Sequence, residues 1–115
     1  MGREIVVIGL KNCDGTRKAR RALEAAGLTP RFRDIREKPL TREEMTALHA
    51  VLGDALVNRR SATWRGLDAA VRNADPATLL AAHPTLMKRP VIMVDGRPYL
   101  GWSPETRAAL LGNAR

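Results

Sequence analysis

Residues 5–18 read IVVIGLKNCDGTRK, and this stretch decides the architecture of the chain. The four branched apolar residues 5–8 predict a strand that is buried on both faces of a parallel or mixed sheet. A polar turn follows, and apolar residues then recur at helical spacing at Ala19, Ala22, Leu23 and Ala26. Gly27 is a typical stop for such a helix. The pattern therefore predicts a strand, a turn and a helix, with Cys13 at the N-terminal end of the helix.

Cys13 is the candidate nucleophile of the chain. The unpaired N–H groups and the positive dipole end of a helix N-terminus favour a thiolate over a thiol, and Lys11, Arg17 and Lys18 add positive charge. The alternative is a small buried cysteine, but a packing cysteine seldom stands in a polar turn ringed with cations. Because the chain has a single cysteine, every disulfide that it forms must be with another molecule.

The chain length of 115 residues is enough for one domain that folds without disulfides or a structural metal. The first residues lack the apolar stretch of a signal peptide, and no apolar run approaches the roughly 18 residues that a membrane span requires. We therefore expect a soluble cytoplasmic protein.

The composition is basic, with 20 Lys and Arg against 12 Asp and Glu and a net charge of +8. Direct binding of nucleic acid is disfavoured because the cations are spread along the chain and no zinc-ligand spacing or aromatic RNA-binding motif is present. A basic surface more plausibly attracts an anionic substrate or an acidic partner.

The segment of about 41–85 predicts a run of helices. Thr41 and Glu44 form a capping-box pattern, and the stripe that follows consists of Met45, Leu48, His49 and Leu52 before Gly53. His49 is interpreted as a packed or interfacial side chain, because no second histidine, cysteine or carboxylate cluster stands at metal-ligand spacing.

Helical spacing continues beyond a short turn at 56–61. Trp64, Leu67 and Val71 predict a further helix, with Trp64 as an anchor in the core. Asp75 and Pro76 then begin another helix, which runs through His83 until Pro84.

The last third of the chain predicts a hairpin and a helix. Strands at 89–94 and 97–101 flank Asp95-Gly96, a two-residue type I′ turn, and Pro98 places the second strand at a sheet edge. The final helix begins at Ser103-Pro104 and ends at Gly112. Its apolar side includes Ala108, Leu110 and Leu111.

A second strand at 31–35 completes the order β-α-β, helices, β-β-α. This order predicts an α/β protein with a thioredoxin-like, glutaredoxin-type fold. Its sheet is mixed and four-stranded, and an all-helical insertion follows the second strand.

Four ordered segments stand out along the chain: Lys11-Asn12-Cys13-Asp14, Asn58-Arg59-Arg60-Ser61-Ala62-Thr63-Trp64-Arg65, His83-Pro84 followed by Lys88-Arg89-Pro90-Val91, and Gly101-Trp102. Together they resemble the arsenate reductase (ArsC) family, and within it the branch that includes Spx and the YffB-type proteins. The resemblance covers nearly the whole chain. It implies a single thioredoxin-fold domain over residues 1–115 and a cis bond between Arg89 and Pro90.

Arsenate reductases of this family bind the oxyanion with a cysteine and three arginines, which cancel charge repulsion and stabilise the leaving oxygen. Arg89 matches the arginine before the proline. The other two positions hold Asn58 and Trp102, and Arg60 is a candidate substitute for the first. The match to an arsenate reductase proper is therefore partial.

Spx-type regulators bind RNA polymerase and usually sense oxidation through a Cys-x-x-Cys pair, but here Thr16 holds the second position. YffB-type proteins are instead taken as glutathione-dependent thiol reductases. The resemblance thus implies that Cys13 attacks an oxidised sulfur or another electrophilic centre and that glutathione resolves the adduct.

Cys13 and Arg89 are the expected catalytic residues. The expected contacts to substrate or glutathione are Lys11, Asn12, Thr16, Arg17, Arg60 and Pro90. No metal or bound cofactor is expected. Glutathione, a glutaredoxin or an oxidised protein thiol are the expected partners, with RNA polymerase as the alternative.

Overall fold

The computed structural model describes residues 4–111, which form two compact units. One unit combines the two ends of the chain, up to Lys38 and from Arg89 onward, and the other comprises Pro39–Lys88. The helical insertion expected at about 41–85 falls in the second unit, whose regular elements are all helices. The single domain expected from the chain length stays a prediction.

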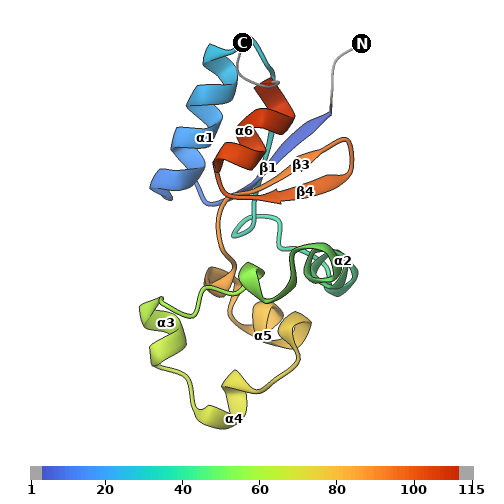
Figure 1. Ribbon diagram of the computed structural model, residues 1–115. Coiled ribbons are helices and arrows are strands. Elements are labelled where there is room, and N and C mark those ends of the chain that lie inside the picture. Colours follow the sequence, from blue (N-terminus) through green and yellow to red (C-terminus); the bar gives the residue numbers. More distant parts are fainter. Residues whose placement is uncertain (1–3, 112–115) are drawn as a thin grey trace. The chain divides into compact units, whose positions relative to one another are not determined.

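The first unit is a sheet with two helices on it (Figure 1). Its elements are β1 (Ile5–Gly9), α1 (Asp14–Ala25), β2 (Arg31–Asp34), β3 (Val91–Val94), β4 (Arg97–Leu100) and α6 (Pro104–Leu111). The strand order is β2-β1-β3-β4. β1 runs parallel to β2 and antiparallel to β3, which is antiparallel to β4. The predicted mixed four-stranded sheet is confirmed.

One core cluster of this unit lies on one face of the sheet, while Ile8 and Val91 are buried on the other face. The cluster consists of alternate residues of β1 and β3 together with residues of α1 and α6: Ile5, Val7, Ala19, Leu23, Ile92, Val94 and Leu110. Burying an aliphatic side chain of this size stabilises a fold by about 1.5–3 kcal/mol. Because α1 and α6 share this core, both cover the same face, and the start of α1 is held against the end of β1.

The hairpin between β3 and β4 forms as predicted. Asp95 and Gly96 have φ angles of 51° and 86°, which is the positive-φ pair that a type I′ turn requires. Pro98 lies on β4, at an edge of the sheet, where a missing N–H costs no ladder hydrogen bond.

The apolar side expected for the last helix is only partly correct. Leu110 is buried, but Ala108 is exposed and Leu111 is 47% exposed. Thr106 is buried instead, because its hydroxyl lies 3.0 Å from that of Ser103, whose Oγ also accepts from the Thr106 N–H and caps the helix. The predicted stop at Gly112 lies outside the described residues.

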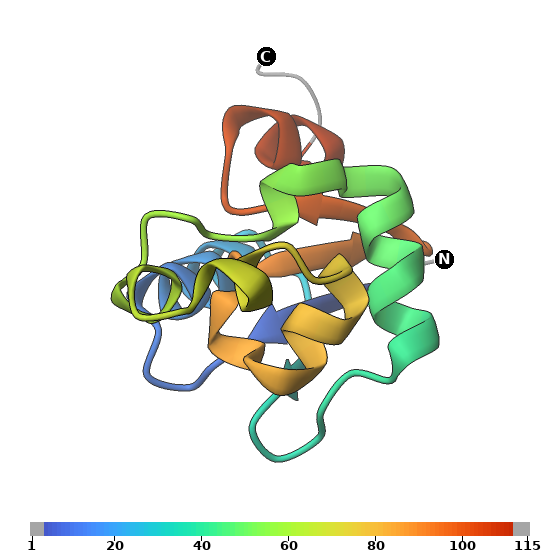
Figure 2. The same cartoon turned by 90° about the horizontal axis from the view of Figure 1, so that it is seen from below.

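The second unit contains short helices around a small apolar centre. They are α2 (Arg42–Leu52), the 3₁₀ helix η1 (Gly53–Leu56), α3 (Ala62–Arg65), α4 (Ala69–Arg72), α5 (Pro76–Ala82) and the 3₁₀ helix η2 (Pro84–Leu86). α2 packs against α5 (Figure 2). Met45 and Leu48 of α2 are buried, as are Leu79 and Leu80 of α5.

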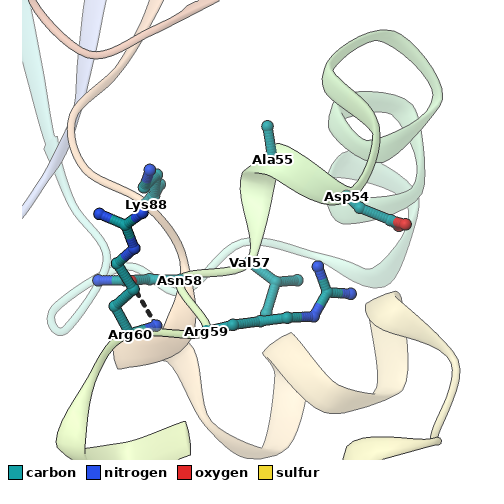
Figure 3. A pocket seen from close by; sticks show the side chains of 7 residues that line it. All are labelled: Asp54, Ala55, Val57, Asn58, Arg59, Arg60 and Lys88. Carbon is teal, nitrogen blue, oxygen red and sulfur yellow. Dashed lines mark hydrogen bonds between the residues drawn. The ribbon is translucent and has the colours of Figure 1, made fainter.

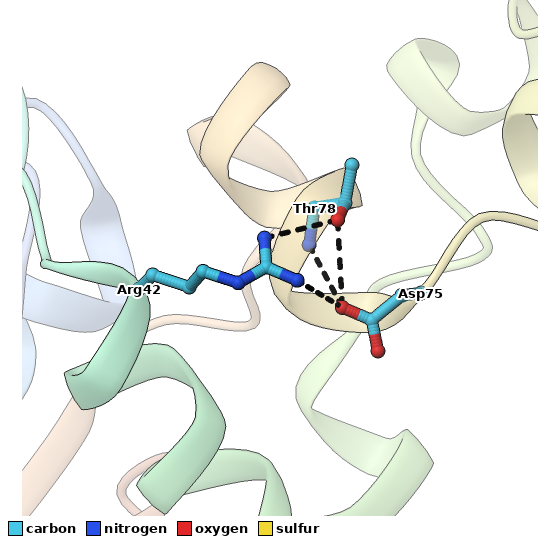
Figure 4. A network of polar contacts seen from close by, with 3 residues as sticks. All are labelled: Arg42, Asp75 and Thr78. Atoms are coloured by element: carbon cyan, nitrogen blue, oxygen red, sulfur yellow. Dashed lines mark hydrogen bonds and ion pairs between the residues drawn. The ribbon is translucent and has the colours of Figure 1, made fainter.

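Both predicted helix caps of this unit are confirmed. Thr41 and Glu44 form the full capping box, and Asp75 caps α5 by accepting from the Thr78 N–H at 3.3 Å. Arg42 joins the two helix starts, because its guanidinium donates to Asp75 at 3.2 Å and to the Thr78 hydroxyl at 3.1 Å (Figure 4).

The prediction of one helix through Trp64, Leu67 and Val71 is wrong. Gly66 ends α3, and Asp68 begins α4. Trp64 is half-buried and is not a core anchor. Its ring instead contacts the guanidinium groups of Arg59 and Arg72, at 5.4 and 5.6 Å from the ring centroid.

None of the helices between residues 4 and 111 is long and apolar enough to cross a membrane.

Candidate active site

Cys13 stands in the connection from β1 to α1 and is the N-cap residue of α1. Its extended backbone, with φ −85° and ψ 123°, is the conformation that a helix cap adopts. The Cys13 N–H donates to the Leu10 carbonyl at 3.1 Å, and its own carbonyl accepts from the Arg17 N–H at 3.0 Å. The thiol is partly exposed. A reagent can therefore reach a sulfur whose backbone is fixed on both sides.

Thr16 lies one turn into α1 and is fully buried. Its hydroxyl oxygen has no partner of standard hydrogen-bond geometry within residues 4–111. The hydroxyl nevertheless lies close enough to the Cys13 sulfur to lower the pKa of the thiol. A buried hydroxyl without a hydrogen-bond partner destabilises the fold. The Cys13 thiolate is therefore the natural acceptor of a hydrogen bond from the Thr16 hydroxyl.

Gly9 makes room for the Thr16 hydroxyl. A Cβ added at Gly9 would overlap Thr16 Oγ1 and would lie 3.0 Å from Thr16 Cγ2. Sequence reasoning did not single out Gly9, although a glycine at the end of a buried strand is a signal of close approach.

Arg89 and Pro90 come from the loop before β3. The peptide bond between them is cis, as the family resemblance implied. A Cβ added at Gly15 would lie 3.5 Å from the Arg89 carbonyl oxygen, 3.5 Å from Pro90 Cδ and 3.9 Å from Cys13 Sγ. Gly15 thus adjoins both the Arg89-Pro90 backbone and the sulfur.

The pKa of the Cys13 thiol is lower than that of an ordinary cysteine. Burial of the sulfur raises this pKa. Hydrogen bonds from the Thr16 side chain, the Thr16 backbone N–H and the Arg89 side chain lower it, and together the lowering effects outweigh the effect of burial. The positive charge of Arg89 acts in the same direction. Thr16 and Arg89 are therefore the two residues that stabilise the Cys13 thiolate.

The cations nearest to Cys13 in sequence are paired with carboxylates. Lys11 lies 3.0 Å from Glu37, whose hydrogen bond and charge raise the pKa of Lys11. Arg17 lies 2.8 Å from Asp14, one turn away. Asn12 is exposed. These pairs leave the electrostatic role at the sulfur to Thr16 and Arg89.

Arg60 belongs to the second unit, where it lines a pocket together with Arg59 and Lys88 (Figure 3). His49 is half-buried, and its Nε2 lies 3.2 Å from Asp54 Oδ1. Within residues 4–111, no three His, Cys, Asp or Glu side chains are grouped so that they could hold a metal ion.

Comparisons with known proteins identify relatives along nearly the whole chain. The sequence model of the ArsC family matches residues 8–110. An uncharacterized protein of Haemophilus influenzae is 40% identical over 104 residues, which cover 86% of this chain and 91% of that protein.

Solved structures agree with these matches. The YffB protein is 33% identical, with a TM-score of 0.85, and the match covers 93% of this chain and 98% of that one. An arsenate reductase (ArsC) related protein from Brucella melitensis is also 33% identical, with a TM-score of 0.74 over 94% of each chain. A glutaredoxin from Archaeoglobus fulgidus shares the fold alone, with a TM-score of 0.50, 15% identity and coverage of 95% and 86%.

The sheet order and the helix that follows β1 define a thioredoxin-like fold with a glutaredoxin-type sheet, into which a helical segment is inserted after β2. More narrowly, the chain belongs to the ArsC family, and the match to YffB supports the predicted branch.

Proposed function

We propose that the protein is a thiol-disulfide oxidoreductase that uses the Cys13 thiolate as its nucleophile and glutathione as its co-substrate. The observation that carries this proposal is the partly exposed Cys13 at the cap of α1, with a pKa lowered by Thr16 and Arg89. A thiolate attacks oxidised sulfur, whereas a thiol does not. Membership of the ArsC family supports a reductase, and the likeness to YffB supports this branch of it.

The reaction balances with glutathione as the only reductant. The Cys13 thiolate attacks the glutathionyl sulfur of a mixed disulfide, so that an S–S bond to Cys13 forms while the substrate's S–S bond breaks. The substrate leaves as a thiolate and takes a proton from water. A glutathione thiolate then attacks the glutathionyl sulfur, which restores the Cys13 thiolate and yields glutathione disulfide. Because the chain holds one cysteine, the resolving thiol comes from another molecule.

Arg89 is proposed to stabilise the sulfur anions of both steps or to bind a glutathione carboxylate, because a guanidinium pairs strongly with either. Thr16 is proposed to hold the thiolate. The other residues proposed to contact substrate or glutathione are Lys11, Asn12, Arg17, Arg60 and Pro90. A glutaredoxin or an oxidised protein thiol is the proposed further partner.

The test is turnover of a glutathione mixed disulfide, coupled to glutathione reductase. The full chain should consume the mixed disulfide, and mass spectrometry should find one glutathionyl group on Cys13. Cys13→Ser should abolish both signals, and Arg89→Gln should slow turnover. Arg21→Gln is the matched control, because it removes an exposed arginine of α1 outside the site.

Other outcomes point to the alternatives. Consumption of arsenate, with glutathione and glutaredoxin supplied, would favour an arsenate reductase. Capture of RNA polymerase subunits without any turnover would favour a regulator. Unchanged turnover in Cys13→Ser would contradict the assignment of the nucleophile.

A further inference from the structure

A pocket of about 350 Å³ lies wholly within the unit of residues 39–88. Its lining residues are Asp54, Ala55, Val57, Asn58, Arg59, Arg60 and Lys88 (Figure 3). This volume is within the range of about 300–1,000 Å³ that is usual for small-molecule sites.

The backbone that carries the pocket is fixed by hydrogen bonds. Val57 and Met87 form an antiparallel bridge. On either side of this bridge, the Asn58 N–H donates to the Leu86 carbonyl and the Lys88 N–H donates to the Leu56 carbonyl, both at 2.7 Å. The two segments that supply the cations are thus held together.

The turn after Asn58 is also fixed. The Asn58 side-chain oxygen accepts from the Arg60 N–H at 3.1 Å, and the Asn58 carbonyl accepts from the Ser61 hydroxyl at 3.0 Å. The Arg65 guanidinium donates to the Arg60 carbonyl at 2.8 Å. The side chains of Arg59 and Arg60 therefore project from an ordered turn.

The charge in the pocket is unbalanced. Within the described part of the chain, no carboxylate forms an ion pair with Arg59, Arg60 or Lys88. Asp54 is the one carboxylate in the lining, and it lies 3.2 Å from His49 Nε2. Figure 3 shows Arg60 and Lys88 on the side of the pocket away from Asp54. Three cations and one carboxylate give the lining a net charge of +2.

Arg59 is held by an aromatic side chain. Its guanidinium lies 5.4 Å from the centroid of the Trp64 ring. Trp64 is itself tied down, because its carbonyl accepts from Arg72 Nε at 3.2 Å while the Arg72 guanidinium contacts the ring. A guanidinium that stacks on a ring keeps its in-plane N–H groups available to an anion.

We propose that this pocket binds the phosphate group of a small phosphate monoester. Such a group carries about −1.5 to −2 charges at neutral pH and three acceptor oxygens on one centre. That charge matches the net charge of +2 in the lining, and one guanidinium group can bind two phosphate oxygens at once. A dicarboxylate would divide the same charge between two separate ends. Arg60 is shared with the residues proposed to contact substrate or glutathione, but the binding of phosphate here does not depend on the chemistry of Cys13.

The test is calorimetric titration of the full chain with phenyl phosphate at low salt. We expect one site, and we expect Arg60→Gln and Lys88→Gln each to weaken binding by about tenfold or more. Trp64→Leu should also weaken binding, although it removes no charge, because Arg59 loses its support. Arg21→Gln removes the same charge from exposed α1 and should leave binding unchanged.

Amide chemical shifts give the location of the binding. Phenyl phosphate should perturb residues 54–60 and 86–88. The proposal is overturned if the shifts centre on Cys13, if Arg21→Gln weakens binding as much as Lys88→Gln does, or if binding is absent. Equal affinity for succinate, or displacement of phenyl phosphate by glutathione at equal concentration, would assign the pocket to carboxylates instead.

Discussion

The helices α1 and α2 are similar in length, but their N-termini differ in chemistry. α2 begins with a capping box, in which Thr41 Oγ1 accepts from the Glu44 N–H at 3.0 Å and Glu44 Oε1 accepts from the Thr41 N–H at 2.8 Å. α1 begins at Cys13, whose side chain makes no cap hydrogen bond of standard geometry. At the third helical position α1 has the buried Thr16, where α2 has Glu44.

This difference separates a helix start that stabilises the fold from one that is proposed to react. A threonine hydroxyl accepts the cap hydrogen bond at any ordinary pH. A cysteine is a strong acceptor only as its thiolate, so the free N–H groups of α1 favour ionisation of the sulfur. The proposed active site is therefore a helix cap in which a reactive group replaces a stabilising one.

The largest expected effect follows from Cys13→Ser. Thiol reactivity should vanish, because the chain has no second cysteine. Serine is a preferred cap, so the free energy of unfolding at pH 6 should rise by about 0.5–1 kcal/mol. Urea denaturation beside an alkylation assay measures both. A variant that is less stable than the parent protein would contradict the view that Cys13 occupies a cap position.

Gly9→Ala should have the next largest effect. The added methyl group overlaps the Thr16 hydroxyl and displaces it from the sulfur. Loss of a hydrogen bond to a charged group should slow alkylation of Cys13 at pH 6 by about tenfold. Thr16→Ala should slow it to a similar extent.

The double variant Gly9→Ala, Thr16→Ala sharpens this test. If Gly9 acts through Thr16, the two effects on alkylation do not add. Additive effects would mean that Gly9 acts by another route. Gly66→Ala is the matched control, because its added Cβ would make only ordinary contacts of 3.6 Å.

Thr41→Ala tests the other helix start. Loss of the capping box should cost about 1 kcal/mol of unfolding free energy and leave alkylation of Cys13 unchanged. Thr46→Ala, an exposed change within the same helix, should alter stability by less than about 0.5 kcal/mol. Equal losses in the two variants would show that the cap of α2 contributes nothing special.

The smallest expected effect is a pH dependence of stability. The pKa of the Cys13 thiol is lower in the folded protein than its ordinary value, because Thr16 and Arg89 favour the thiolate. A lowered pKa stabilises the fold fully above the unfolded value, and this contribution is lost as the pH falls through the folded value. The stability lost in Cys13→Ala should therefore grow from pH 6 to pH 9. The loss in Thr41→Ala should stay level over the same range.

Sequence patterns predicted those parts of the fold that depend on local chemistry. The branched apolar run of β1, the capping box at Thr41 and the Asp95-Gly96 turn each have one strongly favoured structure. The place of Cys13 at the start of α1 followed from the change of period after the strand.

The remaining parts depend on contacts between residues distant in the sequence. No local pattern shows that Gly9 makes room for Thr16 or that Trp64 contacts two guanidinium groups. The pairing of Lys11 with Glu37 also joins separate segments. For the same reason, the prediction from sequence gave the cations near Cys13 too large an effect on the thiol. It also missed the pocket around Lys88.

The central claim is that the Cys13 sulfur is an ionised cap of α1. Its most direct test is the pKa of Cys13 in the full chain, measured by thiolate absorbance against pH with Cys13→Ser as the blank. We predict a midpoint well below the free-cysteine value of roughly 8.5, moved upward by Thr16→Ala and by Arg89→Gln. A midpoint at or above that value, unmoved by either substitution, would contradict the account.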